Sequence, residues 1–442
     1  MGVKVAKFGG SSVADAIQLR KVKNIIESDP DRKYVVVSAP GKRYSDDNKI
    51  TDLLYLCKTH IEHNVGYEQV FQVICDRFRA IELNLNVNVD LEKKLEEIDE
   101  NLKKGASEDY IASRGEYLNA ILTAAYLGYD FVDTAGLVCF DEKGKFLDVE
   151  SNQRLKEELS KHERAVLPGF YGSMPNGEIK TFTRGGSDIT GSLVARAVDA
   201  QIYENWTDVS GFLVADPRIV KNPKPIETVS YVELRELSYM GASVLHEDAV
   251  YPVRARDIPI NIRNTNEPDH PGTTILADAG HVNGDKIITG IAGSKDFVVI
   301  ALYKNMMSAE VGFVRRCLSI LEDYGVPFEH LPSGIDTICI VLSKKKSNGK
   351  LDEILEEIKR RLSPDSMDVY EDVALIATVG RGMNRRLGVS ATLFGALYKA
   401  GVNIRMIDQG SSEMNIIVGV QNKDFEKAIQ AIYDAFFLPE ES

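Results

Sequence analysis

The sequence contains few cysteines, and none of them belongs to a recognisable motif. Its 442 residues include five cysteines, and no two of these form a CxxC pair. Scattered cysteines exclude a zinc ribbon and a disulfide framework, and they are typical of proteins in a reducing compartment. We therefore expect a cytoplasmic protein without a structural metal site.

Long apolar runs are also missing. No run of about 18 apolar residues occurs, and residues 1–5 lead into a predicted strand rather than a signal peptide. The formal net charge of −13 argues against general binding to nucleic acid or to an anionic membrane. The chain length and the 44% hydrophobic content instead predict two or three domains, each with its own core.

Several common catalytic motifs are absent as well. There is no GxxxxGK[ST] segment, and no GxGxxG segment follows a predicted strand. His246 and Glu247 do not continue into HExxH, and no Ser/His/Asp order is suggested. These absences argue against a P-loop, a standard dinucleotide fingerprint and a zinc peptidase site.

Two segments that are present each combine a strand, a glycine pair and a helix. Residues 179–192 have this order around Gly185-Gly186, and residues 3–26 have it around Gly9-Gly10. Free backbone N–H groups and a helix dipole at such a junction form an anion site. An ordinary tight turn into a helix would give the same pattern, so neither segment is decisive alone.

Basic residues and strand patterns support an anion site. Arg184 suits bidentate recognition of a carboxylate or phosphate, whereas Lys7 alone could be a solvated strand lysine. Residues 34–38 are typical of a strand covered on both faces. Alternating strands and helices up to residues 264–286 predict an open, mostly parallel sheet with helices on both faces, and ligands bind such sheets at the strands' carboxyl ends.

The C-terminal part of the chain is a repeat with an offset of 76 residues. The offset aligns Gly312 with Gly388 and Gly334 with Gly410. Each copy predicts a ferredoxin-like βαββαβ module. Modules this small are expected to pack together or across a dimer.

Glycine-hinged anion sites, cationic side chains and an aspartate-rich loop are the parts that phosphoryl transfer needs. That reaction depends on charges and backbone donors around the moving phosphoryl group, and no protein nucleophile is required.

Four segments then carry a family resemblance, and they occur in this order: Lys7-Phe8-Gly9-Gly10-Ser11-Ser12-Val13, Arg184-Gly185-Gly186-Ser187-Asp188, Thr207-Asp208-Val209-Ser210-Gly211 and Ala215-Asp216-Pro217-Arg218. Together they closely resemble the aspartate kinases of the amino-acid kinase family. The tail, including the pattern around Gly410, resembles the tandem ACT-type modules that sense amino acids in those enzymes. The resemblance covers nearly the whole chain.

The resemblance implies an α/β fold, a three-layer αβα sandwich with a mostly parallel sheet, over residues 1–290. It implies a regulatory ACT domain at residues 295–370 and a second, dimer-forming one at residues 371–442. Because the chain ends after this tail, it looks monofunctional, without a fused homoserine dehydrogenase.

The implied activity is ATP- and Mg²⁺-dependent phosphorylation of the L-aspartate side-chain carboxylate to 4-phospho-L-aspartate, the first step of lysine, threonine and methionine biosynthesis. An end-product amino acid would bind between modules of two subunits, in a homodimer or a dimer of dimers. An acidic residue in that site, Glu329, favours lysine over threonine as the effector.

Carried over residue by residue, the resemblance implies four groups of site residues. The catalytic group is Lys7, Gly9, Gly10 and Asp188. The aspartate-binding group is Ser38, Thr51, Glu116, Arg184 and Ser187. The nucleotide-binding group is Lys7, Gly10, Ser11, Thr207, Asp208, Asp216 and Arg218. The effector-binding group is Met307, Gly312, Phe313, Val314, Glu329, Ser333, Gly334 and Asp336. Simpler interpretations exist, since Glu116 could only compensate a helix dipole, and Phe313 and Val314 could be core residues at a helix start.

Two positions depart from the family pattern. The family often has a phosphate-contacting lysine where Ser243 stands, and a tyrosine where Leu213 stands. Lys221 or Lys224 could supply the lost charge. These departures concern nucleotide binding rather than the class of reaction.

Three alternatives remain open at this point. The first is a kinase of glutamate or another small carboxylate. The second, motivated by Ser243, is an amino-acid-sensing protein on a catalytically weak kinase fold. The third, a nicotinamide dehydrogenase with a sensing tail, lacks its glycine fingerprint.

Overall fold

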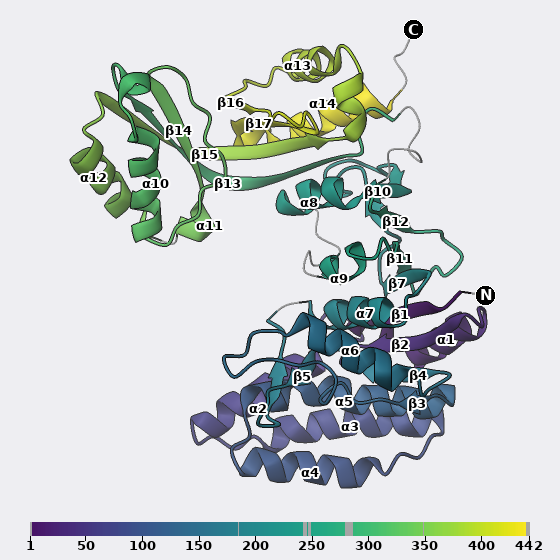
Figure 1. Cartoon of the computed structure of the whole chain (residues 1–442). Helices are drawn as coiled ribbons and strands as arrows, with labels where there is room; N and C mark the ends of the chain where they lie inside the picture. The colour runs from purple at the N-terminus through teal and green to yellow at the C-terminus, as the bar shows by residue number, and fades with distance from the viewer. Residues whose placement is uncertain are drawn as a thin grey trace. The chain divides into compact units, whose positions relative to one another are not determined.

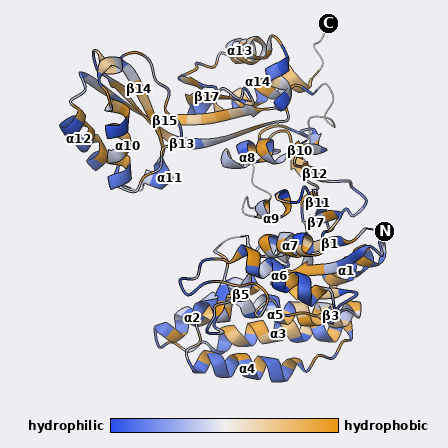
Figure 2. Cartoon of the chain, in the orientation of Figure 1, coloured by the Kyte–Doolittle hydropathy of each residue, from blue (hydrophilic) through white to orange (hydrophobic). Residues whose placement is uncertain are grey.

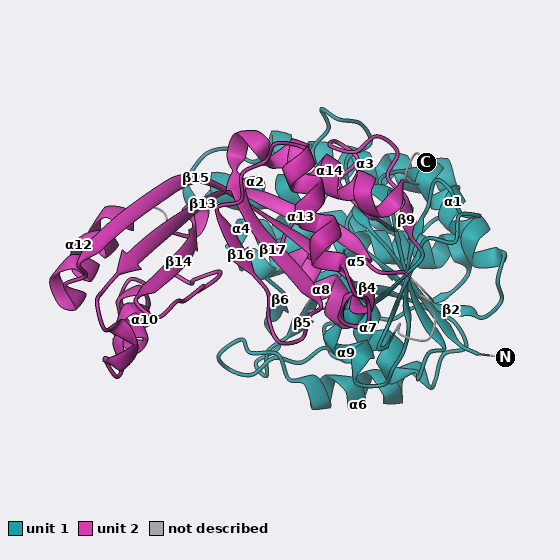
Figure 3. Cartoon of the chain, turned by 90° about the horizontal axis from the view of Figure 1, so that it is seen from above, with its two compact units in different colours: residues 1–212, 227–231, 244–282 teal, residues 213–226, 232–243, 283–442 magenta. Residues whose placement is uncertain are grey.

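The computed structural model describes residues 2–183, 185–241, 245, 249–278, 286–347 and 349–438 (Figure 1). The chain divides into two compact units, which Figure 3 distinguishes by colour. The first unit comprises Met1–Phe212, Glu227–Tyr231 and Val244–Val282, and the second comprises Leu213–Ile226, Val232–Ser243 and Asn283–Ser442. The two units are described separately below.

An eight-stranded sheet forms the centre of the first unit. Its strands are β1 (Lys4–Phe8), β2 (Arg32–Val37), β3 (Asp130–Phe131), β4 (Ala165–Pro168), β7 (Ile202–Thr207), β10 (Thr228–Ser230), β11 (Ile260–Asn264) and β12 (Thr273–Leu276). Their order is β10-β12-β11-β7-β1-β2-β4-β3, and every neighbouring pair is parallel except β11 and β12. Strand β1 therefore lies between β7 and β2, inside the sheet.

Helices cover both faces of this sheet. They are α1 (Ala16–Glu27), α2 (Ile50–Glu62), α3 (Glu68–Leu85), α4 (Leu91–Lys103), α5 (Glu108–Leu127), α6 (Asp148–Leu159), α7 (Gly186–Ala197) and α9 (Tyr251–Arg254). Helices α1 to α5 share one apolar core with Ala6, Phe8, Val35 and Val37, while α7 packs on β1, β2 and β7. The intervening strand residues Val5, Lys7 and Val36 are also buried, as a sheet covered on both faces requires. The predicted three-layer αβα fold is confirmed.

Helix α4 illustrates how sequence spacing decides this packing. Its buried residues Leu91, Leu95, Ile98 and Leu102 follow helical spacing, and charged residues fill the positions between them. Figure 2 shows this mixture as blue and orange patches along one helix.

The strand predicted at residue 179 lies outside the central sheet. The segment that precedes Gly185 forms β6 (Ile179–Thr181), which pairs antiparallel with β5 (Tyr171–Ser173) in a separate two-stranded sheet. Its three residues are only half buried, and Lys180 and Thr181 hydrogen-bond Asp109. A short segment with one polar and one hydroxyl residue cannot replace a buried central strand such as β2. The second glycine pair therefore follows a hairpin and not a strand of the central sheet.

A five-stranded antiparallel sheet forms the core of the second unit. Its strands are β13 (Gly290–Tyr303), β14 (Thr337–Ser343), β15 (Ser366–Val379), β16 (Met406–Asp408) and β17 (Asn415–Gln421), in the order β14-β13-β15-β17-β16. Its helices are α8 (Tyr231–Tyr239), α10 (Phe313–Asp323), α11 (Lys344–Ser347), α12 (Leu351–Leu362), α13 (Val389–Lys399) and α14 (Phe425–Phe437).

The two long strands β13 and β15 each serve both repeats. The second half of β13, from Phe297, pairs with β14, whereas its first half, residues 290–294, pairs only with the end of β15. The register shifts between these halves, where Asp296 adopts a left-handed φ of 67°. The βαββαβ pattern predicts a fourth strand after the last helix of each copy. In the second copy that position is filled by residues 290–294, which precede the first copy in the sequence.

Helix α8 packs against this sheet through polar side chains at helical spacing. Glu233 accepts a hydrogen bond from Thr289 Oγ1 at 2.6 Å, and Glu236 accepts one from Asn415 Nδ2 at 2.6 Å. Residues three apart on a helix share a face, so one side of α8 is fixed to Thr289 and to Asn415 of β17.

Candidate active site

Lys7 lies near the carboxyl end of β1, and the residue is only 7% exposed. Its ammonium pairs with Asp188 in the first turn of α7, at 2.5 Å between Nζ and Oδ1. Gly185, in the left-handed conformation with φ of 59°, is the N-cap of this helix. The structure thus brings together two predicted catalytic residues that are far apart in the sequence.

Sequence reasoning missed Asn205, a third residue that contacts the Lys7–Asp188 pair. Asn205 is the register partner of Lys7 on the neighbouring parallel strand β7, and it is 3% exposed. Its amide Nδ2 donates to Asp188 Oδ1 at 2.9 Å, and Tyr203 on the same strand donates to the backbone oxygen of Asp188 at 3.1 Å. The alternation of β7 and its pairing with β1 were the signals for this residue, because side chains two apart on a strand share a face.

The first glycine pair lies where two loops touch. Gly10 begins a short 3₁₀ helix, η1 (Gly10–Val13), after β1. Its carbonyl accepts from the backbone N–H of Gly41, which follows β2, at 2.8 Å. A Cβ at Gly41 would approach the Gly10 carbonyl carbon to 2.6 Å, so this contact requires glycine. The nearby Ser38 is tied to β1 by its N–H bond to Phe8 O, which places it at the same sheet edge.

Glu116 is a buried carboxyl group at this edge. It accepts a hydrogen bond from the backbone N–H of Ala39, and its Oε2 atom has no partner among the described residues. Burial raises the pKa of Glu116 to about 8, although the Ala39 N–H opposes this shift. Gly115 permits the approach, because a Cβ there would lie 2.7 Å from Ala39 Cβ. A buried acid with one free oxygen can accept an ammonium group.

The remaining predicted aspartate-binding residues come from three elements. Ser187 is buried in the first turn of α7, where Gly169 leaves room for it after β4. Thr51 lies in the first turn of α2. Arg184 lies outside the described residues, as does the departure at Ser243.

Sequence reasoning also missed Phe170, which adopts a φ of 82° between β4 and β5. A bulky residue rarely adopts this conformation, so the surrounding contacts must stabilise it. Its backbone N–H donates to Thr190 Oγ1, and its ring packs where a Cβ on Gly186 would otherwise be. The second glycine of the pair is therefore needed for packing as well as for the turn.

The predicted nucleotide-binding residues are divided between the units. Ser11 and Thr207 lie after β1 and at the end of β7, and Thr207 donates its hydroxyl to Asp208 at 3.1 Å. In the second unit, Asp216 and Arg218 form an exposed ion pair at 2.6 Å, and the Arg218 hydrogen bond lowers the pKa of Asp216. Lys224, which could supply a missing charge, donates its ammonium to the carbonyl of Phe437.

Most predicted effector residues surround the start of α10 in the second unit. Gly312 is its N-cap with φ of 83°, and Met307 and Phe313 belong to the core of the first repeat. Val314 is exposed. Ser333, Gly334 and Asp336 belong to a loop that lies beside the loop before α10. Two backbone hydrogen bonds join these loops: the Ser308 N–H donates to Ile335 O, and the Lys304 N–H donates to Asp336 O.

Glu329 has a different environment. Its side chain is 4% exposed, and its Oε1 atom accepts from Lys346 Nζ at 2.8 Å. Its Oε2 atom accepts from the hydroxyl of Tyr239 at the end of α8. The carboxylate predicted to bind an effector ammonium is thus already paired with an ammonium of the same chain.

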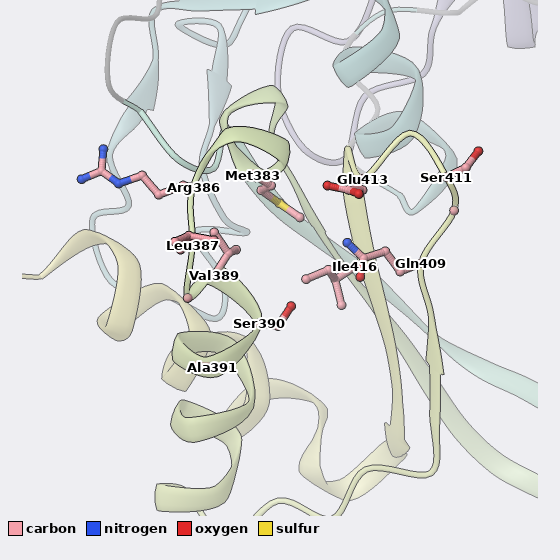
Figure 4. A pocket seen from close by; sticks show the side chains of 12 residues that line it. Met383, Arg386, Leu387, Val389, Ser390, Ala391, Gln409, Ser411, Glu413 and Ile416 are labelled. Carbon is pink, nitrogen blue, oxygen red and sulfur yellow. The ribbon is translucent and has the colours of Figure 1, made fainter.

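A cavity of about 610 Å³ lies in the second repeat (Figure 4). It is lined by Met383, Arg386, Leu387, Gly388, Val389, Ser390, Ala391, Gln409, Gly410, Ser411, Glu413 and Ile416. Met383, Gly388 and Gly410 are the repeat equivalents of three predicted effector residues of the first copy. Figure 4 shows Arg386 pointing away from the other side chains.

Two features are absent from the described part of the chain. No helix there is both long and apolar enough to cross a membrane. In the same residues, no three His, Cys, Asp or Glu side chains are grouped so that they could hold a metal ion.

The fold and site define a class of protein, and comparison with known proteins agrees. Residues 2–264 match the amino acid kinase family, and residues 376–436 match the ACT domain. The chain belongs to the amino acid kinase family.

Three relatives narrow this assignment. Aspartokinase 3 of Bacillus subtilis (strain 168) is 39% identical and is matched over 98% of this chain and 99% of its own. The aspartate kinase of Clostridium acetobutylicum, described as an allosteric enzyme, is 53% identical over 99% of this chain and 100% of its own, with a TM-score of 0.91. E. coli aspartokinase III has been solved in complex with aspartate and ADP and in complex with lysine and aspartate. These two structures are 26% and 25% identical to this chain, and each has a TM-score of 0.76. Each match covers 98% of this chain and at least 99% of the other. Within its family, the chain is an aspartokinase, and it is an enzyme.

The first prediction concerns Asn205. Replacing it with leucine removes the amide donor while keeping a similar volume, so Asp188 and Lys7 lose a fixed position. We expect kcat to fall about tenfold, the effect of roughly one hydrogen bond of 1.4 kcal/mol. The matched control is Asn261→Leu, a buried asparagine of β11 that donates to Pro271 O and Thr273 O. Steady-state kinetics and melting temperature of both variants would separate the two effects. A normal kcat in folded Asn205→Leu would contradict a role in positioning.

Proposed function

We propose that this enzyme transfers the γ-phosphoryl group of ATP to the β-carboxylate of L-aspartate. A carboxylate oxygen attacks the γ-phosphorus, the bond to the β,γ-bridging oxygen breaks, and ADP leaves with 4-phospho-L-aspartate as the other product. The observation that carries this proposal is the buried Lys7–Asp188 pair beside the Gly9-Gly10 turn. It places a cation and backbone donors at the carboxyl edge of a parallel sheet, where ligands of such folds bind.

Charge repulsion is the main obstacle to this reaction. ATP and a carboxylate are both anionic, and one cation at about 4 Å offsets roughly 4 kcal/mol at an effective dielectric of about 20. Lys7 supplies such a cation at a site where little water competes. In the absence of ligands, Asp188 holds the Lys7 ammonium in place.

The α-groups of aspartate need opposite charges. In our proposal, Glu116 binds the α-ammonium through its free Oε2, and Arg184 binds the α-carboxylate. Ser38, Thr51 and Ser187 complete this pocket. In our proposal the adenine nucleotide contacts Ser11, Thr207 and Asp208 of the first unit. The E. coli relative that was solved with ADP supports the binding of a nucleotide.

Magnesium fits this site as a companion of ATP. Mg²⁺ keeps several waters and usually binds through phosphates and one or two carboxylates, so a complete protein cage is unnecessary. The ion would neutralise phosphate charge that Lys7 alone leaves uncompensated.

We further propose feedback inhibition by lysine at the first regulatory repeat. The start of α10, which has no side-chain cap, suits an α-carboxylate, and Glu329 suits a side-chain ammonium. The E. coli relative solved with lysine and aspartate supports this choice. Such inhibition fits the first step of a pathway to lysine, threonine and methionine.

Two exposed residues support assembly of the regulatory repeats with a second copy of the chain. Val311 and Leu387 are equivalent by the 76-residue offset, and they are 95% and fully exposed. Both side chains are therefore available for contact with a second copy of the chain. We propose a homodimer, or a dimer of dimers, formed through the ACT domains.

Substrate choice gives the second prediction. With ATP and Mg²⁺, hydroxylamine should trap an acyl phosphate from aspartate and much less from glutamate, because an extra methylene displaces the reacting carboxylate from the phosphoryl group. Colorimetric detection of the hydroxamate measures both rates. Comparable turnover with glutamate would contradict the proposed substrate.

The third prediction tests Lys7. Replacement with methionine keeps the aliphatic chain but removes the charge, so kcat should fall by about 10² or more, as for loss of a transition-state charge donor. Lys4→Met is the matched control, since Lys4 lies on the same strand but pairs with Asp29 at 2.6 Å. A normal rate in Lys7→Met would exclude this residue from the mechanism.

The fourth prediction concerns protons. With a pKa near 8, Glu116 is mostly protonated at pH 7 in the empty site. An incoming ammonium favours the ionised form, so aspartate binding should release about one proton. Calorimetry in phosphate and Tris buffers measures this number, and Glu116→Gln should abolish the release.

The raised pKa of Glu116 also affects folding stability. The folded state holds a proton on Glu116 that the unfolded state loses above pH about 4.5, so this group makes stability fall as pH rises toward 8. Glu116→Gln should flatten that part of the stability curve in the free enzyme.

Absence of proton release from the wild-type protein would contradict the assignment of Glu116 to the ammonium.

A further inference from the structure

Glu329 has both carboxylate oxygens engaged within the second unit. Lys346 of α11 donates to Oε1 at 2.8 Å, and the Tyr239 hydroxyl of α8 donates to Oε2. The Lys346 ammonium also lies 5.4 Å from the centre of the Tyr239 ring, within range of a cation–π contact. The three side chains therefore form one cluster around a buried negative charge.

The cluster is asymmetric in exposure. The Glu329 side chain is 4% exposed, whereas that of Lys346 is 47% exposed. Lys346 can therefore move into water at small cost, because it is already half solvated. Glu329 cannot lose its cation without leaving a desolvated charge unpaired. Any group that displaces Lys346 must bring a positive charge of its own.

We infer that Lys346 is an internal competitor for the effector's side-chain ammonium. The inference rests on the proposed binding of lysine at Glu329. Lys346 carries the same primary ammonium on the same four-carbon stem as free lysine, and it occupies Glu329 when the effector is absent. Lysine then exchanges one ammonium for another, while Tyr239 keeps its hydrogen bond to the second oxygen.

This exchange has two consequences for effector binding. It weakens lysine binding, because the effector must first break the internal pair, and it thereby sets a higher threshold for inhibition. It also selects for a cationic side chain, because a neutral amino acid cannot replace the charge that it displaces. Exposed and half-exposed ion pairs are weak, so removing the competitor should tighten lysine binding about two- to fivefold.

The fifth prediction is tested with Lys346→Met, which keeps the apolar stem. The matched control is Lys345→Met, an exposed lysine one position earlier on α11. Lysine binding to the full-length wild-type enzyme and both variants is measured by titration calorimetry, alongside inhibition of the aspartate-dependent rate. We expect a two- to fivefold lower Kd and half-inhibitory concentration only in Lys346→Met, with the uninhibited kcat unchanged.

Norleucine, which has lysine's carbon chain without the ammonium, provides the second arm. Its affinity should remain well below that of lysine in both proteins, because it brings no ammonium to Glu329. Equal lysine affinity in wild type and Lys346→Met would overturn the competitor role and leave the effector site standing. If lysine binds neither protein, the proposed effector assignment itself fails. If norleucine binds the wild-type enzyme as tightly as lysine, the side-chain ammonium is not recognised at Glu329, and the exchange of charges is overturned.

Discussion

The parallel register of β1 and β7 is the constraint on which the catalytic site depends. It sets Lys7 directly opposite Asn205, so that both side chains reach the same carboxylate on α7. A shift of β7 by one residue against β1 would turn Asn205 to the opposite face of the sheet. The buried strands on either side of β1 therefore hold the Lys7 cation at the position where we propose that it meets phosphate charge. The glycine contacts at the strand ends add the space that the ligands need.

In the second unit, a buried carboxylate rather than a strand register joins separate segments. Glu329 joins α8 to the first repeat through Tyr239, and α8 is held further along by Glu233 and Glu236. A desolvated charge that has two partners makes such a contact sensitive to any new cation. Residues of three separate segments thus respond to the state of one side chain.

The sequence predicted what is local and missed what depends on tertiary contacts. Strand and helix patterns and the 76-residue offset were sufficient for the fold class, whereas Lys7 and Asp188 were selected through the family resemblance. Asn205 was missed because its importance comes from the strand beside it. Lys346 stands in a lysine-rich segment, and nothing in that pattern indicates which lysine meets Glu329. Likewise, β6 has the alternation of a sheet strand, but its pairing with β5 depends on chain folding after β4.

The strands that both repeats share have a further consequence. Because residues 290–294 complete the second repeat from a position before the first, neither repeat is a separable segment of the chain. Removal of either repeat alone would leave a strand of the other repeat without its hydrogen-bonded neighbour. Gene rearrangement can therefore exchange this tail between enzymes only as an undivided block. The two repeats must diverge in sequence side by side while they keep a common backbone.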